Sequence, residues 1–150
     1  EEQKERFLPA LIQGNDRACF GVTEPDAGLN TTRLSTRATR EGDHYLINGR
    51  KMWTSTAQTA NKILIIARTT AFEDCVNPTD GLTLFYTKLD RERVEVRLIE
   101  KMGRKAVDSN ALFIDDLIVP VETESALRVM GGNVFFMGLT QSEYSFLQKQ

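Results

Sequence analysis

The sequence has little of several features that mark other protein classes. Its 150 residues include 2 cysteines, 1 histidine and 1 tryptophan. Cys19 and Cys75 lie far apart and form no Cys-x-x-Cys motif, which excludes a disulfide scaffold and indicates free thiols in a reducing compartment. We therefore expect a cytoplasmic location. With a single histidine and two distant cysteines, we also expect no metal site.

Neither charge nor hydrophobicity is concentrated along the chain. The formal net charge is −2 with 27% charged residues, which argues against binding to nucleic acid or a membrane surface through bulk charge. The longest purely apolar run, Ile63 to Ala67, is far shorter than the ~20 residues that span a bilayer. The start, Glu1 to Arg6, lacks the basic and then apolar layout of a signal peptide. We expect no nucleic-acid partner and no membrane span.

Most standard catalytic motifs are missing as well. There is no Gly-x-Ser-x-Gly elbow, no phosphate-binding Gly-x-x-x-x-Gly-Lys-Ser/Thr loop, no His-Glu-x-x-His and no Gly-x-Gly-x-x-Gly after a strand. The one histidine, His44, stands beside Asp43 at the start of an expected strand, where a solvated side chain is the ordinary interpretation. Any activity has to come from other features.

Hydrophobic periodicity predicts a short helix followed by a β-domain. Phe7, Leu8, Leu11 and Ile12 follow helical spacing, and Gly14 with Asn15 would end that helix. The period then changes to two, and no long helical pattern interrupts the strands. The expected strands are Ala18–Val22, Leu34–Arg40, His44–Ile47, Lys51–Thr54, Lys62–Ala67, Leu82–Thr87, Val94–Leu98 and Ala111–Ile114. We expect a mainly β fold, an antiparallel barrel or two-sheet sandwich preceded by a short helix.

Turn residues separate these strands. They are Glu41-Gly42-Asp43, Asn48-Gly49, Pro78-Thr79-Asp80-Gly81 and Asp115-Asp116. Asn48-Gly49 between alternating runs is the strongest hairpin signal, because both residues tolerate positive φ. The pattern therefore predicts a tight hairpin at Asn48-Gly49.

Two stretches suggest a ligand site. In Cys19 to Gly28, an expected strand runs through Thr23-Glu24-Pro25 into a loop of small residues, whose N–H groups could hold a phosphate or the edge of a heterocycle. In Gly49 to Thr56, the only tryptophan, Trp53, precedes three hydroxyl residues, which suits a flat ring with polar edges. Taken singly, the first also fits a plain surface turn and the second a core tryptophan.

Together with two later motifs, these stretches resemble the acyl-CoA dehydrogenase family. The motifs are Val22-Thr23-Glu24-Pro25-Asp26-Ala27-Gly28, Ile47-Asn48-Gly49-Arg50-Lys51-Met52-Trp53, Lys101-Met102-Gly103-Arg104, and Phe113-Ile114-Asp115-Asp116 leading to Val119-Pro120. On this resemblance, residues 1–16 are the end of an N-terminal helical domain and residues 17–122 are the middle β-domain. Residues 123–150 are an atypical tail.

The resemblance implies a bound FAD. Phe20, Val22 and Thr23 would line the flavin, Gly28 and Leu29 would lie against the cofactor phosphates, and Trp53, Thr54 and Ser55 would follow the ring system, with the Ser55 hydroxyl near N5. Many relatives have Ser where Leu29 stands, so only main-chain contact is expected at that position. Many have Thr in place of Ser55, which keeps the hydroxyl.

The resemblance also implies a reaction and partners. Family members oxidise the α,β carbon–carbon bond of an acyl-CoA, pass a hydride to FAD and hand electrons to an electron-transferring flavoprotein; most are homotetramers. Their catalytic base is a glutamate of a C-terminal helical domain, which no glutamate here matches, so we assign no catalytic residue to this chain. The alternatives are a non-catalytic truncated flavin-domain fragment, or an acyl-CoA oxidase or flavin monooxygenase on the same fold.

The tail departs from the family pattern. The family continues with a run similar to Gly-Leu-Asn-Pro-Glu-Arg-Ile, whereas this chain has Met137-Gly138-Leu139-Thr140-Gln141-Ser142-Glu143-Tyr144. With suitable codons for Leu139 to Tyr144, a shifted reading frame encodes Asn-Pro-Glu-Arg-Ile. Our hypothesis is that the tail from about Thr123 is translated out of frame; the alternative is a divergent extension.

Overall fold

The computed structural model describes residues 2–28 and 30–121. The elements are α1 (Glu2–Ile12), β1 (Ala18–Gly21), η1 (Thr31–Arg33), β2 (Arg37–Glu41), β3 (His44–Thr54), β4 (Lys62–Arg68), η2 (Phe72–Asp74), β5 (Leu82–Lys88), β6 (Val94–Leu98) and β7 (Asn110–Pro120). Every expected strand is present, although two of them are parts of the single strand β3. The predictions for Leu29 and for the tail at 123–150 lie outside the described residues.

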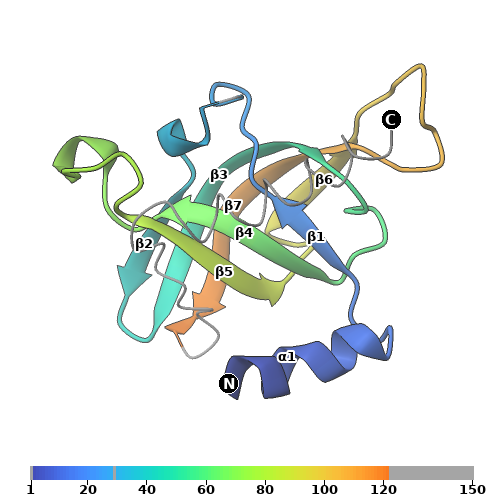
Figure 1. The fold of residues 1–150 in the computed structure, drawn as a ribbon, viewed down its shortest axis with the longest axis horizontal. Helices are drawn as coiled ribbons and strands as arrows, with labels where there is room; N and C mark the ends of the chain where they lie inside the picture. The colour runs from blue at the N-terminus through green and yellow to red at the C-terminus, as the bar shows by residue number, and fades with distance from the viewer. Residues whose placement is uncertain (1, 29, 122–150) are drawn as a thin grey trace, which may run out of the picture.

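The strands form one seven-stranded sheet that curls into half a barrel (Figure 1). Its order is β1-β4-β2-β3-β7-β6, and β5 also pairs with β4. The pairs β2–β3, β3–β7, β4–β5 and β6–β7 are antiparallel, whereas β1 and β2 run parallel to β4. The predicted mainly β, mainly antiparallel fold is confirmed. Parallel strands need a long connection, and the chain provides one in both cases, because β2 and β3 lie between β1 and β4 and β3 lies between β2 and β4.

Strand β4 lies at the centre of the core because both of its faces are buried. Ile63 and Ile65 belong to a large hydrophobic cluster that also contains Phe85, while Ile66 belongs to a second cluster with Leu34. A strand buried on both faces has a nearly continuous apolar sequence, which explains the run from Ile63 to Ala67.

Helix α1 lies beside the sheet and packs against β5. The ring of Phe7 meets that of Tyr86 edge to face, with centroids 5.0 Å apart. Gly14 follows the helix with a φ of +75°, which confirms the predicted helix end. The side chain of Asn61 then fixes the linker, since its Oδ1 accepts from the main-chain N of Arg17 at 2.7 Å.

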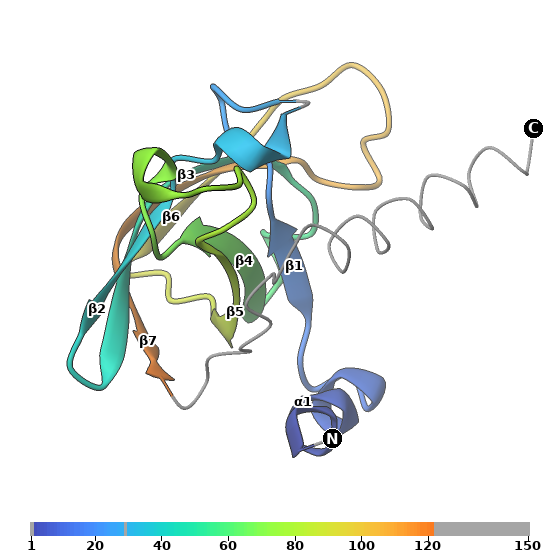
Figure 2. The same ribbon diagram turned by 60° about the vertical axis from the view of Figure 1, so that its left-hand side comes forward.

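Two of the longer connections lie together at the end of the sheet opposite α1. In the views of Figures 1 and 2, the connection between β1 and β2 and the loop between β6 and β7 lie at the end of the sheet away from α1. Loops at a sheet end that are held by a rigid scaffold are common places for binding sites.

The predicted hairpin at Asn48-Gly49 is wrong. Both residues lie inside β3, where the pairing with β7 shifts register between Ile47 and Gly49. The tight turn is at Gly42-Asp43, where Glu41 pairs with His44 and Gly42 has a φ of +61°. The physical reason is that residues which tolerate unusual φ values occur in β-bulges as well as in hairpin turns, so the same residue pair is compatible with both.

The predicted turn at Asp115-Asp116 is wrong for the same reason. Both residues lie inside β7, and Asp116 has a φ of +48°. Asn48 and Asp116 stabilise this irregularity through two hydrogen bonds across the strands. Asn48 Nδ2 donates to Asp116 Oδ1, and Asp116 N donates to Asn48 Oδ1, each at 2.8 Å.

We predict that Gly49→Ala destabilises the fold. Gly49 has a φ of +153°, and a Cβ there would lie 2.5 Å from Thr36 Oγ1 and 2.8 Å from Thr36 Cα. Overpacking combined with an unfavourable φ should lower the free energy of unfolding by about 2 to 3 kcal/mol, measured by urea denaturation. The control is Gly103→Ala, because no atom lies within 4 Å of a Cβ at Gly103. Equal stability of the two variants would contradict this account of β3.

Candidate functional site

A buried ion pair joins the two stretches that the sequence singles out. Lys51 Nζ lies 2.8 Å from Glu24 Oε1, and the side chains are 0% and 2% exposed. Lys51 Nζ also donates to the carbonyl of Val22 at 3.1 Å. The side chain of Lys51 on β3 is therefore bound to two residues of the loop that follows β1.

Glu24 has further partners that satisfy its carboxylate. Oε2 accepts from Ser35 N at 2.6 Å and from Ser35 Oγ at 2.7 Å, and Oε1 accepts from Thr36 N at 3.0 Å. A buried carboxylate requires such donors as well as its counter-charge. Glu24 therefore holds three segments together: its own loop, the segment before β2, and β3.

The pKa values of the pair follow from this environment. Burial opposes ionisation of Glu24, but the charge and hydrogen bond of Lys51, together with the N–H donors, lower the pKa of Glu24 to about 2. Burial lowers the pKa of Lys51 to about 8, although the Glu24 carboxylate opposes that change. Both groups are therefore charged at neutral pH, and the pair has a structural role.

The two stretches also meet through their main chains. Met52 N donates to Thr23 O at 2.8 Å, which places the last residues of β3 beside the loop after β1. Near this junction, Phe20 and Trp53 are 41% and 58% exposed, whereas Val22 is buried. Main-chain polar groups and two exposed aromatic rings therefore lie on neighbouring segments.

Trp53 stands on an unusual backbone. It has a φ of +61°, and the β3–β7 register shifts between Lys51 and Thr54. Such a conformation costs a bulky residue roughly 1–3 kcal/mol, and strain of this kind is concentrated at functional sites. The irregularity turns Trp53 to the solvent while Lys51 and Thr54 on either side are buried.

The remaining predicted site residues differ in accessibility. Thr54 is 1% exposed, and its hydroxyl lacks a hydrogen-bond partner among the described residues. Ser55 is exposed and lines a small hollow of about 330 Å³ with Lys101, Gly103 and Arg104. Gly28 is exposed, with no atom within 4 Å of a Cβ built there. The structure thus brings the Lys101 to Arg104 motif to Ser55 and leaves the loop at Gly28 open.

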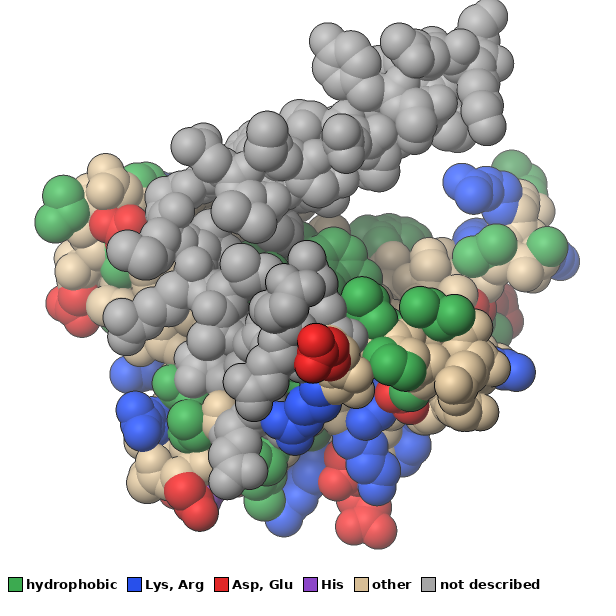
Figure 3. Space-filling view, turned by 60° about the horizontal axis from the view of Figure 1, so that its bottom comes forward, with side chains coloured by type: hydrophobic (Ala, Val, Ile, Leu, Met, Phe, Trp, Pro, Cys, Tyr) green, Lys and Arg blue, Asp and Glu red, His purple; other side chains and the backbone are tan. Residues whose placement is uncertain are grey.

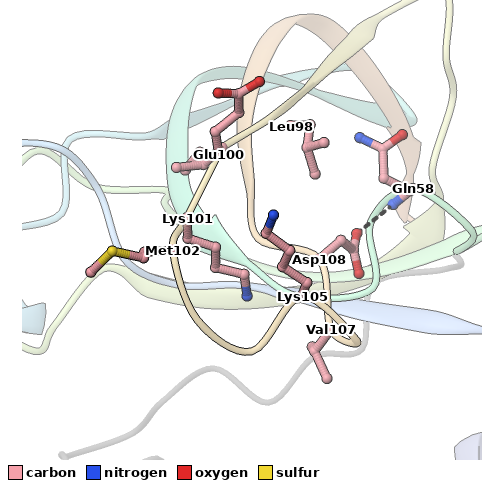
Figure 4. Close-up of a pocket in the computed structure, with 9 residues that line it drawn as sticks. Gln58, Leu98, Glu100, Lys101, Met102, Lys105, Val107 and Asp108 are labelled. Carbon is pink, nitrogen blue, oxygen red and sulfur yellow. Dashed lines mark hydrogen bonds between the residues drawn. The ribbon is translucent and has the colours of Figure 1, made fainter.

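A larger cavity of about 770 Å³ lies between the β6–β7 loop and the turn after β3 (Figure 4). The side chains around it include Gln58, Leu98, Lys101, Met102, Lys105 and Asp108. In Figure 4, a dashed line joins the Asp108 carboxylate to the main chain of Gln58, where Gln58 N donates to Asp108 Oδ2 at 3.1 Å. Sequence reasoning missed Asp108, because no local motif marks a carboxylate that binds a turn 50 residues earlier in the chain.

Sequence reasoning also missed Arg68, which is 4% exposed at the end of β4. Its guanidinium donates to the carbonyls of Leu34, Pro78 and Asp80 at 2.9, 2.8 and 3.2 Å, and to that of Thr32. Arg68 therefore fastens the η1 segment and the β4–β5 loop to the sheet. The only sequence signal was an arginine that ends an apolar strand.

Figure 3 shows the side-chain types on one face of the molecule. Acidic, basic and hydrophobic side chains are interspersed on the face drawn in Figure 3. Within residues 2–28 and 30–121, no helix has the length and hydrophobicity needed to cross a membrane. The same residues contain no group of three or more His, Cys, Asp and Glu side chains that could hold a metal ion.

We predict that the Glu24–Lys51 pair contributes a coupling energy to stability. Removing one partner leaves the other charge buried without compensation, so Glu24→Gln and Lys51→Met should each lower the free energy of unfolding by about 3 kcal/mol. The double variant should lose clearly less than the sum, as measured by urea denaturation at pH 7. Strictly additive losses would show that the two side chains are not coupled.

The same pair predicts a pH dependence. Because the native pKa of Glu24 is lowered from 4.5 to about 2, its contribution to stability is complete above pH 4.5 and is lost as the pH falls towards 2. The free energy of unfolding of Glu24→Gln should therefore depend less on pH in this interval than that of the unchanged chain. Identical slopes in the two proteins would contradict the assignment.

Comparison with known proteins finds matches over most of this chain. Residues 19–117 match the acyl-CoA dehydrogenase middle domain. The short-chain specific acyl-CoA dehydrogenase of Clostridium acetobutylicum is 35% identical over 123 residues, which are 81% of this chain and 31% of that protein. The caffeyl-CoA reductase–Etf complex subunit CarC of Acetobacterium woodii is also 35% identical over 123 residues, with the same coverage of 81% and 31%.

A solved structure gives the same result. The acyl-CoA dehydrogenase from Geobacillus kaustophilus superposes with a TM-score of 0.75 and 31% sequence identity, covering 82% of this chain and 32% of that one. The chain spans about a third of the length of the relatives it matches. Since the family match covers most of the chain, including both stretches joined by Glu24 and Lys51, the chain belongs to the acyl-CoA dehydrogenase family.

Proposed function

We propose that this chain supplies the flavin-binding surface of an FAD-dependent acyl-CoA dehydrogenase, which oxidises the α,β carbon–carbon bond of an acyl-CoA. The observation that carries this proposal is the exposed Trp53, held on a strained backbone beside the main chain of Thr23. A flat ring with polar edges needs an apolar surface next to hydrogen-bonding groups. The exposed aromatic rings and the neighbouring main chain fit an isoalloxazine in both respects.

The individual roles follow from exposure and family resemblance. Trp53 and Phe20 would offer apolar surface to the ring system, because both are exposed aromatic side chains. Thr23, which is partly exposed, would bind the pyrimidine edge with its main chain and hydroxyl. Val22 would contribute mainly through its main chain, since its side chain is buried.

The other end of the cofactor would lie along the open loop. Gly28 and Leu29 would approach the phosphates, and the missing side chain of Gly28 permits close contact. Ser55 is exposed and its hydroxyl would reach towards N5. Thr54 would support this turn from beneath the surface, because it is almost fully buried. When bound, FAD would supply the hydride acceptor of the reaction.

The catalytic base is proposed to come from outside the described residues. Glu24 lies in the proposed flavin loop, but its carboxylate is buried and bound to Lys51, so it has no free position from which to take a substrate proton.

The substrate would be an acyl-CoA and the complete protein a homo-oligomer, by family resemblance a tetramer. The name of the relative CarC supports an electron-transferring flavoprotein as partner. The two unpaired cysteines favour a reducing compartment such as the cytoplasm.

We predict that the chain binds FAD and that Trp53 supplies much of the contact. Trp53→Ala should raise the dissociation constant of FAD roughly tenfold, because a large aromatic contact is lost. Trp53→Phe should have a smaller effect, and Ser55→Ala should leave affinity nearly unchanged. In a complete relative that carries this domain, Ser55→Ala should slow flavin reduction by the substrate. Equilibrium dialysis and stopped-flow reduction measure the two effects.

The control for this experiment is Val76→Ala, because Val76 is 94% exposed and belongs to the β4–β5 loop rather than to the proposed site. It should bind FAD like the unchanged chain. If the folded chain did not bind FAD, or if Trp53→Ala bound it with unchanged affinity, the proposed surface would be wrong.

We predict that the chain alone does not dehydrogenate acyl-CoA. Without a positioned carboxylate, abstraction of the α-proton loses general-base assistance worth roughly 10²–10⁴-fold in rate. The assay combines the chain, FAD, a medium-chain acyl-CoA and an artificial electron acceptor, and follows dye reduction together with oxygen consumption. Turnover comparable to that of an intact family member would show that the chain contains a base, and oxygen-dependent turnover would indicate an oxidase.

A further inference from the structure

The turn after β3 is held from both sides by the side chains of Asp108, which lies two residues before β7, and of Asn110, which begins β7. Asp108 Oδ1 accepts from Thr56 N at 2.9 Å, and Asp108 Oδ2 accepts from Gln58 N at 3.1 Å. Asn110 Nδ2 donates to Thr54 O at 2.9 Å. The peptide groups before and after Ser55 are therefore both held by this polar cluster.

The cluster is closed within itself. Asn110 Nδ2 also donates to Asp108 Oδ2 at 2.6 Å, and Gln58 Nε2 donates to Asn110 Oδ1 at 2.7 Å. Asn110 is fully buried, so one member of the network is fixed in the core. Although burial opposes ionisation of Asp108, the surrounding donors lower its pKa, which keeps it an acceptor at neutral pH.

Two residues in and directly before this turn are under backbone strain. Trp53 and Thr56 have φ values of +61° and +62°, which bulky and β-branched residues rarely adopt. A strained turn persists only where surrounding interactions fix it. Charged hydrogen bonds such as those of Asp108 are stronger than neutral ones, so Asp108 is the strongest hydrogen-bonding group in the cluster.

We propose that Asp108 is a positioning residue for the flavin: by holding the main chain on the far side of Ser55, it sets where the Ser55 hydroxyl and the Trp53 ring meet the cofactor. This inference rests on the proposed FAD site. Asp108 belongs to the β6–β7 loop and also lines the large cavity of Figure 4, and its hydrogen bonds to Thr56 N and Gln58 N connect that loop to the turn that carries Ser55.

The test compares Asp108→Ala with the matched variant Asp80→Ala. Asp80 also binds a turn through two hydrogen bonds, from Asn77 N at 3.2 Å and Asn77 Nδ2 at 3.0 Å, but that turn belongs to the β4–β5 loop. The readouts are acrylamide quenching of Trp53 emission in the FAD-free chain, the dissociation constant of FAD, and the thermal midpoint. Trp53 is the only tryptophan, so its emission reports on the strained turn alone.

We expect Asp108→Ala to change the Trp53 quenching constant and to raise the dissociation constant of FAD roughly tenfold. Asp108→Asn, which keeps one acceptor oxygen, should restore part of the affinity. Asp80→Ala should lower the thermal midpoint with neither effect. If Asp108→Ala matched Asp80→Ala in quenching and in affinity, the inference would be overturned while FAD binding stood. If the unchanged chain bound no FAD, the proposed function itself would fail.

Discussion

The buried ion pair between Glu24 and Lys51 is the interaction on which the proposed site depends. Burying either charge alone would cost several kcal/mol, and only the paired and fully hydrogen-bonded arrangement offsets that cost. The carboxylate binds the segment before β2 through two main-chain N–H groups, and Lys51 binds the carbonyl of Val22. These contacts hold the loop after β1 against β3, where Met52 N donates to Thr23 O.

Thr36 connects the ion pair to β3 and to the end of β4. Its N–H donates to Glu24 and its carbonyl accepts from Arg68 N at 2.7 Å, so its main chain is held from two sides. Gly49 lies against it at a distance that leaves no room for a Cβ. The bulge in β3, the ion pair and the anchor at the end of β4 thus form one connected unit, and the strained turn at Trp53 lies at its edge.

Much of the fold could be predicted from the sequence, because alternation of buried and exposed residues is a local property. The strands follow from it. The helix end at Gly14 follows from a residue that tolerates positive φ, and the mainly antiparallel sheet follows from the lack of a long helical pattern between the strands. The predictions of a hairpin at Asn48-Gly49 and a turn at Asp115-Asp116 are wrong, because residues that tolerate positive φ suit bulges and turns equally well, and only the pairing of β3 with β7 decides between them. The predicted site residues depend on the family motifs. The ion pair, Arg68 and Asp108 could not be predicted, because their partners lie far away in the sequence and follow no local pattern.

The central claim is that the loop after β1 and the end of β3 form one surface for a flavin ring. The most direct measurement is Trp53 emission during titration of the chain with FAD, with bound FAD determined in parallel by dialysis. Since Trp53 is the only tryptophan, the account predicts that its emission is quenched in proportion to bound FAD and reaches a plateau at one FAD per chain. FAD binding that left the emission of Trp53 unchanged would contradict the account.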